Sequence, residues 1–181
     1  MDEKTYTGGL SPEYAVLGLL AHGPAHGYDL HQRLMADLGQ IWHCSLSQTY
    51  NILKRLEGQG YIAGEVQEQP KLPARRLFHL TDTGRQRFEA WLYSPTPASV
   101  RAIRVEFTTR LYFIHSLNPA KAPPLLEAQT SEIQKGLARL GKTLAEIPPG
   151  QTFNRLGLEL RLNQLNAILA WLEECREALQ L

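Results

Sequence analysis

The fold of this chain is decided by residues 46–62, which read Leu46-Ser47-Gln48-Thr49-Tyr50-Asn51-Ile52-Leu53-Lys54-Arg55-Leu56-Glu57-Gly58-Gln59-Gly60-Tyr61-Ile62. On a helical wheel, at about 100° per residue, one arc is apolar. It holds Leu46, Thr49, Ile52, Leu53 and Leu56. The opposite arc is polar and holds Ser47, Gln48, Asn51, Lys54, Arg55 and Gly58, with Tyr50 at its border. Amides, hydroxyls and cations contact base edges and phosphates in a DNA major groove, although a solvated surface helix gives the same wheel.

Composition and charge leave the function open. The chain has 181 residues, of which 43% are hydrophobic and 20% charged, enough for one large or two small globular domains. The net charge is +1, and residues 1–93 carry nine Lys and Arg against ten Asp and Glu. Overall charge therefore does not support a nucleic-acid partner, and DNA binding would have to rest on the local placement of charge.

Three helices are predicted in the first sixty residues. The first begins at Ser11-Pro12-Glu13, where serine can cap the helix and proline suits its first position. The second is expected over residues 25–38. The third is the stretch at 46–58, which Ser45 or Ser47 can cap and which ends at a pair of glycines.

Residues 61–93 complete the pattern. Residues 61–68 and 74–80 are predicted to be strands around a proline-containing turn. Residues 85–93 are predicted to form a fourth helix, capped by Thr81-Asp82-Thr83-Gly84. Three helices, a two-stranded wing and a following helix make a winged helix-turn-helix domain.

The second half of the chain is predicted to be helical throughout. The prolines of Ser94-Pro95-Thr96-Pro97 mark a boundary, because proline cannot continue a helix. We therefore predict a mainly α protein with two domains: a winged-helix DNA-binding domain at 1–93 and an all-helical dimerisation or effector domain at 94–181. The last helix carries a leucine seam at alternating steps of four and three residues, formed by Leu158, Leu162, Leu165, Leu169, Leu172 and Leu179. The seam fits a dimer interface and an intramolecular bundle equally well.

The first half resembles the PadR family of bacterial transcriptional regulators. The resemblance extends from Ser11 to Trp91, and its order and spacing are more specific than any single piece. Its parts are Tyr14-Ala15-Val16-Leu17-Gly18-Leu19-Leu20, His26-Gly27-Tyr28-Asp29-Leu30, Trp42, the stretch from Ser47 to Glu57, Gly60, and Leu80-Thr81-Asp82-Thr83-Gly84-Arg85. The second half resembles the longer-tailed members of the family only in length and helical character.

This resemblance implies a homodimer that binds double-stranded DNA, most often as a repressor, and that a small aromatic or hydrophobic effector frequently releases. The family's recognition-helix positions correspond to Ser47, Gln48, Tyr50, Asn51, Lys54 and Arg55, with Tyr28 as a phosphate contact. In the wing, the basic residues are Lys71, Arg75 and Arg76. Acidic residues near them reduce the expected attraction to phosphate, so we expect modest non-specific affinity and a shallow salt dependence.

Other possible sites have less support. The histidines at 22–31 place no pair at i, i+4 on one helix, and no cofactor loop or catalytic motif occurs, so we predict no metal, no cofactor and no enzyme activity. Cys44, just before the third helix, is either a redox-active thiolate or a small, partly buried thiol. Trp91, Phe107 and Trp171 could line an effector pocket, although aromatic side chains at helical spacing also form cores.

The expected location is the cytoplasm, without a membrane span. Residues 1–6 lack the profile of a signal peptide, and no run approaches the roughly 18 apolar residues that a span requires. The leading hypothesis is thus a dimeric repressor. The alternatives are a winged-helix protein-interaction module that does not bind DNA, which the near-neutral charge favours, and a small-molecule sensor whose output is not transcriptional.

Overall fold

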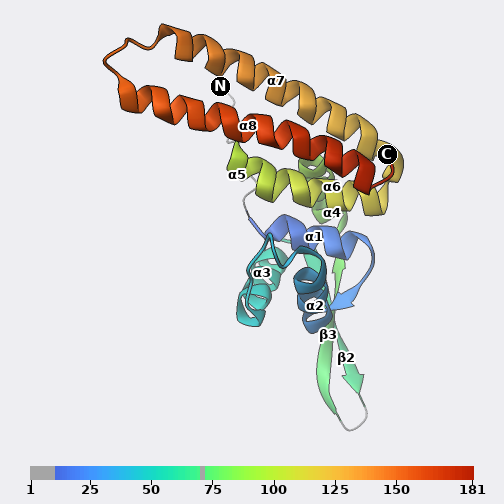
Figure 1. Ribbon diagram of the computed structural model, residues 1–181. Helices are drawn as coiled ribbons and strands as arrows, with labels where there is room; N and C mark the ends of the chain where they lie inside the picture. Colours follow the sequence, from blue (N-terminus) through green and yellow to red (C-terminus); the bar gives the residue numbers. More distant parts are fainter. Residues whose placement is uncertain (1–10, 70–71) are drawn as a thin grey trace, which may run out of the picture. The chain divides into compact units, whose positions relative to one another are not determined.

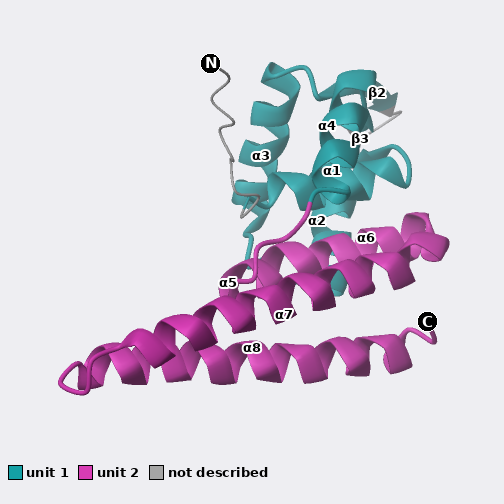
Figure 2. Ribbon diagram, turned by 90° about the horizontal axis from the view of Figure 1, so that it is seen from above, with its two compact units in different colours: residues 1–94 teal, residues 95–181 magenta. Residues whose placement is uncertain are grey.

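The computed structural model describes residues 11–69 and 72–181, and it divides into two compact units. Unit 1 is Met1–Ser94 and unit 2 is Pro95–Leu181 (Figure 2). Unit 1 combines helices with a small antiparallel sheet, whereas the described elements of unit 2 are all helical (Figure 1). The structure confirms the predicted fold class, a mainly α protein with a winged helix followed by a helical region.

Unit 1 differs from the sequence prediction at the start of the second helix. Its helices are α1 (Glu13–Ala21), α2 (Gly27–Leu38), α3 (Leu46–Gly58) and α4 (Asp82–Leu92), and its strands are β1 (Ala25–His26), β2 (Ile62–Gln69) and β3 (Leu72–Leu80). The predicted helix at 25–38 was wrong over its first two residues, which form β1 and pair with Phe78 and Leu77 of β3. The wing therefore belongs to a three-stranded sheet with the order β1-β3-β2.

Both ends of α3 are fixed by local hydrogen bonds. Ser45 is the N-cap: its Oγ accepts from the Gln48 amide at 3.2 Å, and the Gln48 Oε1 accepts from the Ser45 amide at 2.7 Å. This reciprocal arrangement is a capping box. At the other end Gly60 has a φ of 75°, and the Tyr61 amide donates to the Leu56 carbonyl at 2.9 Å. These features form a Schellman motif, which needs glycine because of the left-handed backbone.

The two faces of α3 follow the helical wheel, with one exception. Thr49, Ile52, Leu53 and Leu56 are buried, as predicted. Leu46 was predicted to be buried with them but is 38% exposed, because it is the first helical residue and precedes the turn that reaches the core. The unit 1 core that receives this face includes Val16, Leu17, Leu30, Leu34, Leu38 and Phe88.

Unit 2 consists of a segmented helix followed by a long helical hairpin. Its elements are α5 (Val100–Ala102), the π-helical segment η1 (Ile103–Phe107), α6 (Thr108–Leu117), the 3₁₀ turn η2 (Pro119–Lys121), α7 (Ala122–Glu146) and α8 (Thr152–Ala178). The helices α7 and α8 lie side by side along most of their lengths (Figures 1 and 2). Across the described residues, no helix combines the length and apolar character needed to cross a bilayer.

The leucine seam of α8 is partly covered within the chain itself. Leu165 and Leu172 are buried, so the intramolecular alternative accounts for these two residues. The other four, Leu158, Leu162, Leu169 and Leu179, are half-buried. A different face of α8 carries the most exposed apolar side chains: Phe153 is 88% exposed, Leu156 53% and Leu160 58%.

A buried polar cluster holds the start of unit 2. Arg110 of α6 is 1% exposed, and its guanidinium lies 3.3 Å from the Glu106 carboxylate. Arg110 also donates to the Thr96 hydroxyl, and the Gln129 amide of α7 donates to the Thr96 carbonyl at 3.3 Å. A buried ion pair is tolerated only where further hydrogen bonds compensate its desolvation, and Thr96 supplies one of them.

The junction between the wing and α4 gives a test of the fold. The Thr81 hydroxyl caps α4 by accepting from the Gly84 amide at 3.1 Å. A Cβ at Gly84 would lie 1.9 Å from the Tyr61 carbonyl oxygen, so Gly84→Ala forces the backbone apart. We expect this substitution to lower the free energy of unfolding by about 1–3 kcal/mol. Urea denaturation measures the effect.

Gly58→Ala is the matched control, because a Cβ there meets nothing within 4 Å. Alanine at this helical position should leave stability unchanged or raise it by up to about 1 kcal/mol. Equal stabilities for the two variants would contradict the close approach of α4 to Tyr61.

Candidate nucleic-acid interface

The outward face of α3 presents polar side chains that are not needed to hold the fold. Ser47, Asn51 and Lys54 are exposed, and Tyr50 is 46% exposed. Within the described part of the chain, the side chains of Asn51 and Lys54 have no hydrogen-bond or ion-pair partner. Gln48 is also exposed, but its carbonyl oxygen is engaged in the capping box, which leaves its amide nitrogen as the group available to a partner. This face therefore offers an amide, a hydroxyl and a cation to a partner.

Arg55, by contrast, is tied to the interior of unit 1. Its Nε donates to the carboxylate of Glu13 on α1, and the Arg87 guanidinium lies 3.6 Å from the same carboxylate. Glu13 is only 8% exposed, and a buried carboxylate is costly unless it is paired. The predicted DNA contact at Arg55 is thus engaged in connecting α3 to α1.

Arg76 is similarly engaged with a carboxylate in the last turn of α3. Its Nη1 donates to Glu57 at 2.9 Å, its Nη2 reaches the other oxygen of the same carboxylate, and its guanidinium lies 5.3 Å from the centre of the Phe78 ring. Glu57 also accepts from the Gly64 amide of β2 at 3.1 Å. This ion pair joins the last turn of α3 to both long strands of the wing.

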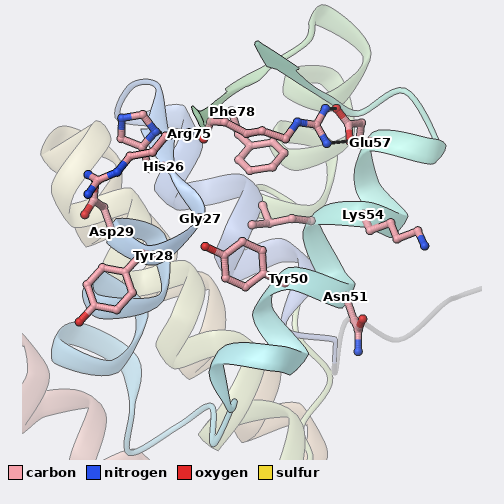
Figure 3. A pocket seen from close by; sticks show the side chains of 12 residues that line it. His26, Gly27, Tyr28, Asp29, Tyr50, Asn51, Lys54, Glu57, Arg75 and Phe78 are labelled. Atoms are coloured by element: carbon pink, nitrogen blue, oxygen red, sulfur yellow. Dashed lines mark hydrogen bonds and ion pairs between the residues drawn. The ribbon is translucent and has the colours of Figure 1, made fainter. Parts of the chain in front are cut away.

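A cavity of about 710 Å³ opens between the start of α2, the outer side of α3 and strand β3 (Figure 3). It brings together six of the ten residues predicted to bind DNA: Tyr28, Tyr50, Asn51, Lys54, Arg75 and Arg76. Ser47, Gln48 and Arg55 do not line it, and Lys71 lies outside the described residues. His26, Gly27, Asp29 and Glu57 also line it and were not among the predicted residues. Of these, Gly27 could have been identified from the sequence, because this glycine directly precedes Tyr28 at a helix start.

The charge around the cavity is only slightly positive. Lys54 and Arg75 are exposed, and Asp29 in the first turn of α2 opposes them. Arg76 and Glu57 neutralise each other through their ion pair. Hydroxyl and amide groups therefore make up much of the polar surface that a ligand would meet.

The two cysteines are poor candidates for reactive thiols. Burial raises the pKa of the Cys44 thiol above its ordinary value, although Cys44 lies just before α3. Burial and the nearby Glu174 raise the pKa of Cys175 to about 11. Both shifts disfavour the thiolate, which is the reactive form. Among the described residues, no group of three or more His, Cys, Asp or Glu side chains is arranged to hold a metal ion.

The aromatic residues predicted to line an effector pocket fall into different units. Trp91 belongs to unit 1, where its ring stacks on Tyr14 with centroids 4.6 Å apart. Phe107 and Trp171 belong to unit 2, where their rings meet edge to face at 6.3 Å. Phe107 is fully buried, while Trp171 is half-buried.

Comparison with known proteins assigns both halves of the chain. The model of the transcriptional regulator PadR-like family matches residues 16–90, and the model named virulence activator alpha C-term matches residues 103–180. The negative transcriptional regulator PadR of Bacillus subtilis (strain 168) is 35% identical over 130 residues, which cover 71% of this chain and 70% of that protein.

Solved structures with similar sequences include two of B. subtilis PadR. The one in complex with operator DNA is 30% identical, covers 92% of this chain and 98% of its own, and has a TM-score of 0.45. The one in complex with p-coumaric acid is 29% identical, with coverages of 94% and 99% and a TM-score of 0.41. The relationship itself rests on the PadR-like match and on the 35% identity to the B. subtilis regulator, which agree with the winged-helix fold. This chain belongs to the PadR family of transcriptional regulators.

Proposed function

We propose that this protein is a homodimeric repressor that binds a specific DNA operator. The outward face of α3 carries the proposal, since it presents Ser47, Asn51 and Lys54 on a helix whose other face is buried. Membership in the PadR family and the relation to a negative transcriptional regulator support a repressor role. Each copy would place α3 in a major groove, with half-sites about 34–36 Å apart or a multiple of that spacing.

The residues around α3 take three roles in this proposal. Asn51, Lys54 and Ser47 contact base edges and nearby phosphates, together with the free amide nitrogen of Gln48. The side chains that contact the DNA backbone are Tyr28, Tyr50 and Arg75, with Lys71 in the wing. Arg55 and Arg76 act as positioning residues, because Glu13 and Glu57 engage their guanidinium groups.

The proposed dimer interface is on α8. Phe153, Leu156 and Leu160 are more than half exposed, and apolar side chains grouped on one helix face are typical of an interaction surface. The seam leucines lie on the opposite side of α8 and do not extend this surface, and Leu165 and Leu172 among them serve the packing within each copy. A dimer is also required for two recognition helices to bind one operator.

We further propose that a small aromatic acid relieves repression. B. subtilis PadR, the relative at 35% identity, has been crystallised with p-coumaric acid. In this chain we assign half-buried Trp171 of unit 2 to such a ligand, with the buried Phe107 ring packed edge to face against it. Trp91 is assigned to the core of unit 1 because it stacks on Tyr14.

A second possible function is a protein-interaction module without DNA binding. The observation in its favour is the charge balance, with ten acidic against nine basic residues in positions 1–93 and only a slight positive excess around the cavity. Binding to the DNA upstream of the protein's own gene separates the two functions. No binding at low salt would favour the interaction module.

We expect the protein to shift its own upstream DNA in a gel, and Lys54→Ala to weaken that binding by about 1–3 kcal/mol. Lys142→Ala, which removes an equally exposed lysine from α7, should bind as the wild type does. The salt dependence should be shallower than the slope of about −9 that ten phosphate contacts give. Adding p-coumaric acid should release the DNA. Equal losses in the two lysine variants would contradict the assignment of α3.

Arg55→Ala tests whether Arg55 positions the helix or reads a base. We expect weaker binding to operator and scrambled DNA alike, together with a loss of about 1 kcal/mol in unfolding free energy, because Glu13 loses a partner. Arg33→Ala, at an exposed position on α2, is the control for losing one cation. Unchanged stability with a selective loss on the operator would instead make Arg55 a base contact.

Leu160→Glu tests the dimer interface. A charge at this position should convert the dimer to a monomer, since burying each leucine contributes roughly 1.5–3 kcal/mol per copy. Asn166→Glu places the same charge on α8 about 120° around the helix and should leave the dimer intact. Sedimentation equilibrium measures both masses. A dimeric Leu160→Glu variant would place the interface elsewhere.

A further inference from the structure

The start of α2 approaches α3 more closely than any side chain on Gly27 would allow. A Cβ at Gly27 would lie 2.7 Å from Cε1 and 3.0 Å from Cζ of the Tyr50 ring, and 3.1 Å from a methyl of Leu53. Gly27 is buried, and its backbone φ is not in the left-handed region. Space for the Tyr50 ring, rather than backbone freedom, is therefore what requires glycine here.

This contact sets the direction of the Tyr50 side chain. Figure 3 shows the ring beside Gly27, with its hydroxyl end on the α2 side of the cavity, while Lys54 and Asn51 point away from α2. The Tyr50 side chain therefore points in a different direction from the other polar groups on the outward face of α3. It lies across the cavity wall, between the recognition helix and the first turn of α2.

We infer that Gly27 is a positioning residue whose missing side chain seats Tyr50, so that the Tyr50 hydroxyl binds a backbone phosphate of the operator. The inference rests on the proposed DNA binding and assigns one contact within it. A tyrosine hydroxyl donates well to a phosphate oxygen, and such contacts orient a protein on DNA without reading its sequence.

The surroundings of the hydroxyl favour a phosphate over a base edge. The first amides of α2 lie on this side of the cavity, and the N-terminus of a twelve-residue helix favours an anion. Arg75 adds a cation to the same cavity, whereas Asp29 opposes it. Lys54 and Asn51, on the other side of Tyr50, have the positions from which a helix reaches base edges.

Gly27→Ala tests the position of the Tyr50 side chain in a domain that remains folded. The atoms nearest to the new methyl belong to the far end of the tyrosine side chain, which can rotate away from α2. The Leu53 methyl, 3.1 Å from the new Cβ, needs to move by only a few tenths of an ångström. We therefore expect a folded variant with a melting temperature close to that of the wild type and a displaced Tyr50 hydroxyl.

Fluorescence anisotropy with the protein's upstream DNA and a scrambled fragment of equal length gives the test. We expect Gly27→Ala to weaken binding to both fragments by the same factor, about tenfold or more, as for loss of a hydrogen bond to a charged group. Tyr50→Phe, which keeps the ring on Gly27 but removes the hydroxyl, should give a similar loss. In the Tyr50→Phe background, Gly27→Ala should cause little further loss. Gly58→Ala is the matched glycine control.

Three results would overturn the inference. They are wild-type affinity in Tyr50→Phe, a loss confined to the upstream DNA, and an undiminished effect of Gly27→Ala in the Tyr50→Phe background. Because Tyr50→Phe does not disturb Gly27, it decides the role of the hydroxyl even if Gly27→Ala is unstable. Wild-type protein that binds neither fragment would overturn the proposed function itself, and this outcome is separate from all three.

Discussion

The orientation of α3, the proposed recognition helix, depends on one buried carboxylate. Glu13 lies on α1 among apolar residues, and its charge has to be compensated where water is largely excluded. Arg55 from α3 and Arg87 from α4 both approach it, and Arg87 also lies 4.4 Å from the centre of the Tyr61 ring. A single interior charge thus links three helices of unit 1. The outward face of α3 is therefore positioned from inside unit 1.

Local patterns in the sequence predict most of this fold. Periodicity identified the buried face of α3, and the residues that cap α3 and α4 act as expected, with Ser45 and Thr81 as the N-caps. The strand β1 was missed because two residues carry no periodicity and form a strand only by pairing with β3. Long-range ion pairs could not be predicted from the sequence either. Arg55 and Glu13 are 42 positions apart, and no local pattern distinguishes a paired arginine from a solvent-exposed one.

The same pairs bear on the proposed sequence-specific DNA binding of a winged helix with a nearly neutral charge. Where arginines are bound to carboxylates of the same chain, fewer cations remain to attract any phosphate indiscriminately. The groups left on the outward face of α3 include Asn51 and Ser47, whose hydrogen bonds depend on direction rather than on net charge. Weak general attraction combined with directional contacts raises the ratio of specific to non-specific binding.

The buried cluster around Thr96 determines where the two units can be separated. Arg110 and Gln129 both bind Thr96, which precedes the first helix of unit 2 by several residues. A C-terminal fragment that begins at the helix itself would leave the Arg110 guanidinium buried without this hydroxyl. A fragment that begins at Pro95 keeps both hydrogen bonds. The segment that looks like a connector in the sequence is, in physical terms, the first folded part of the helical unit.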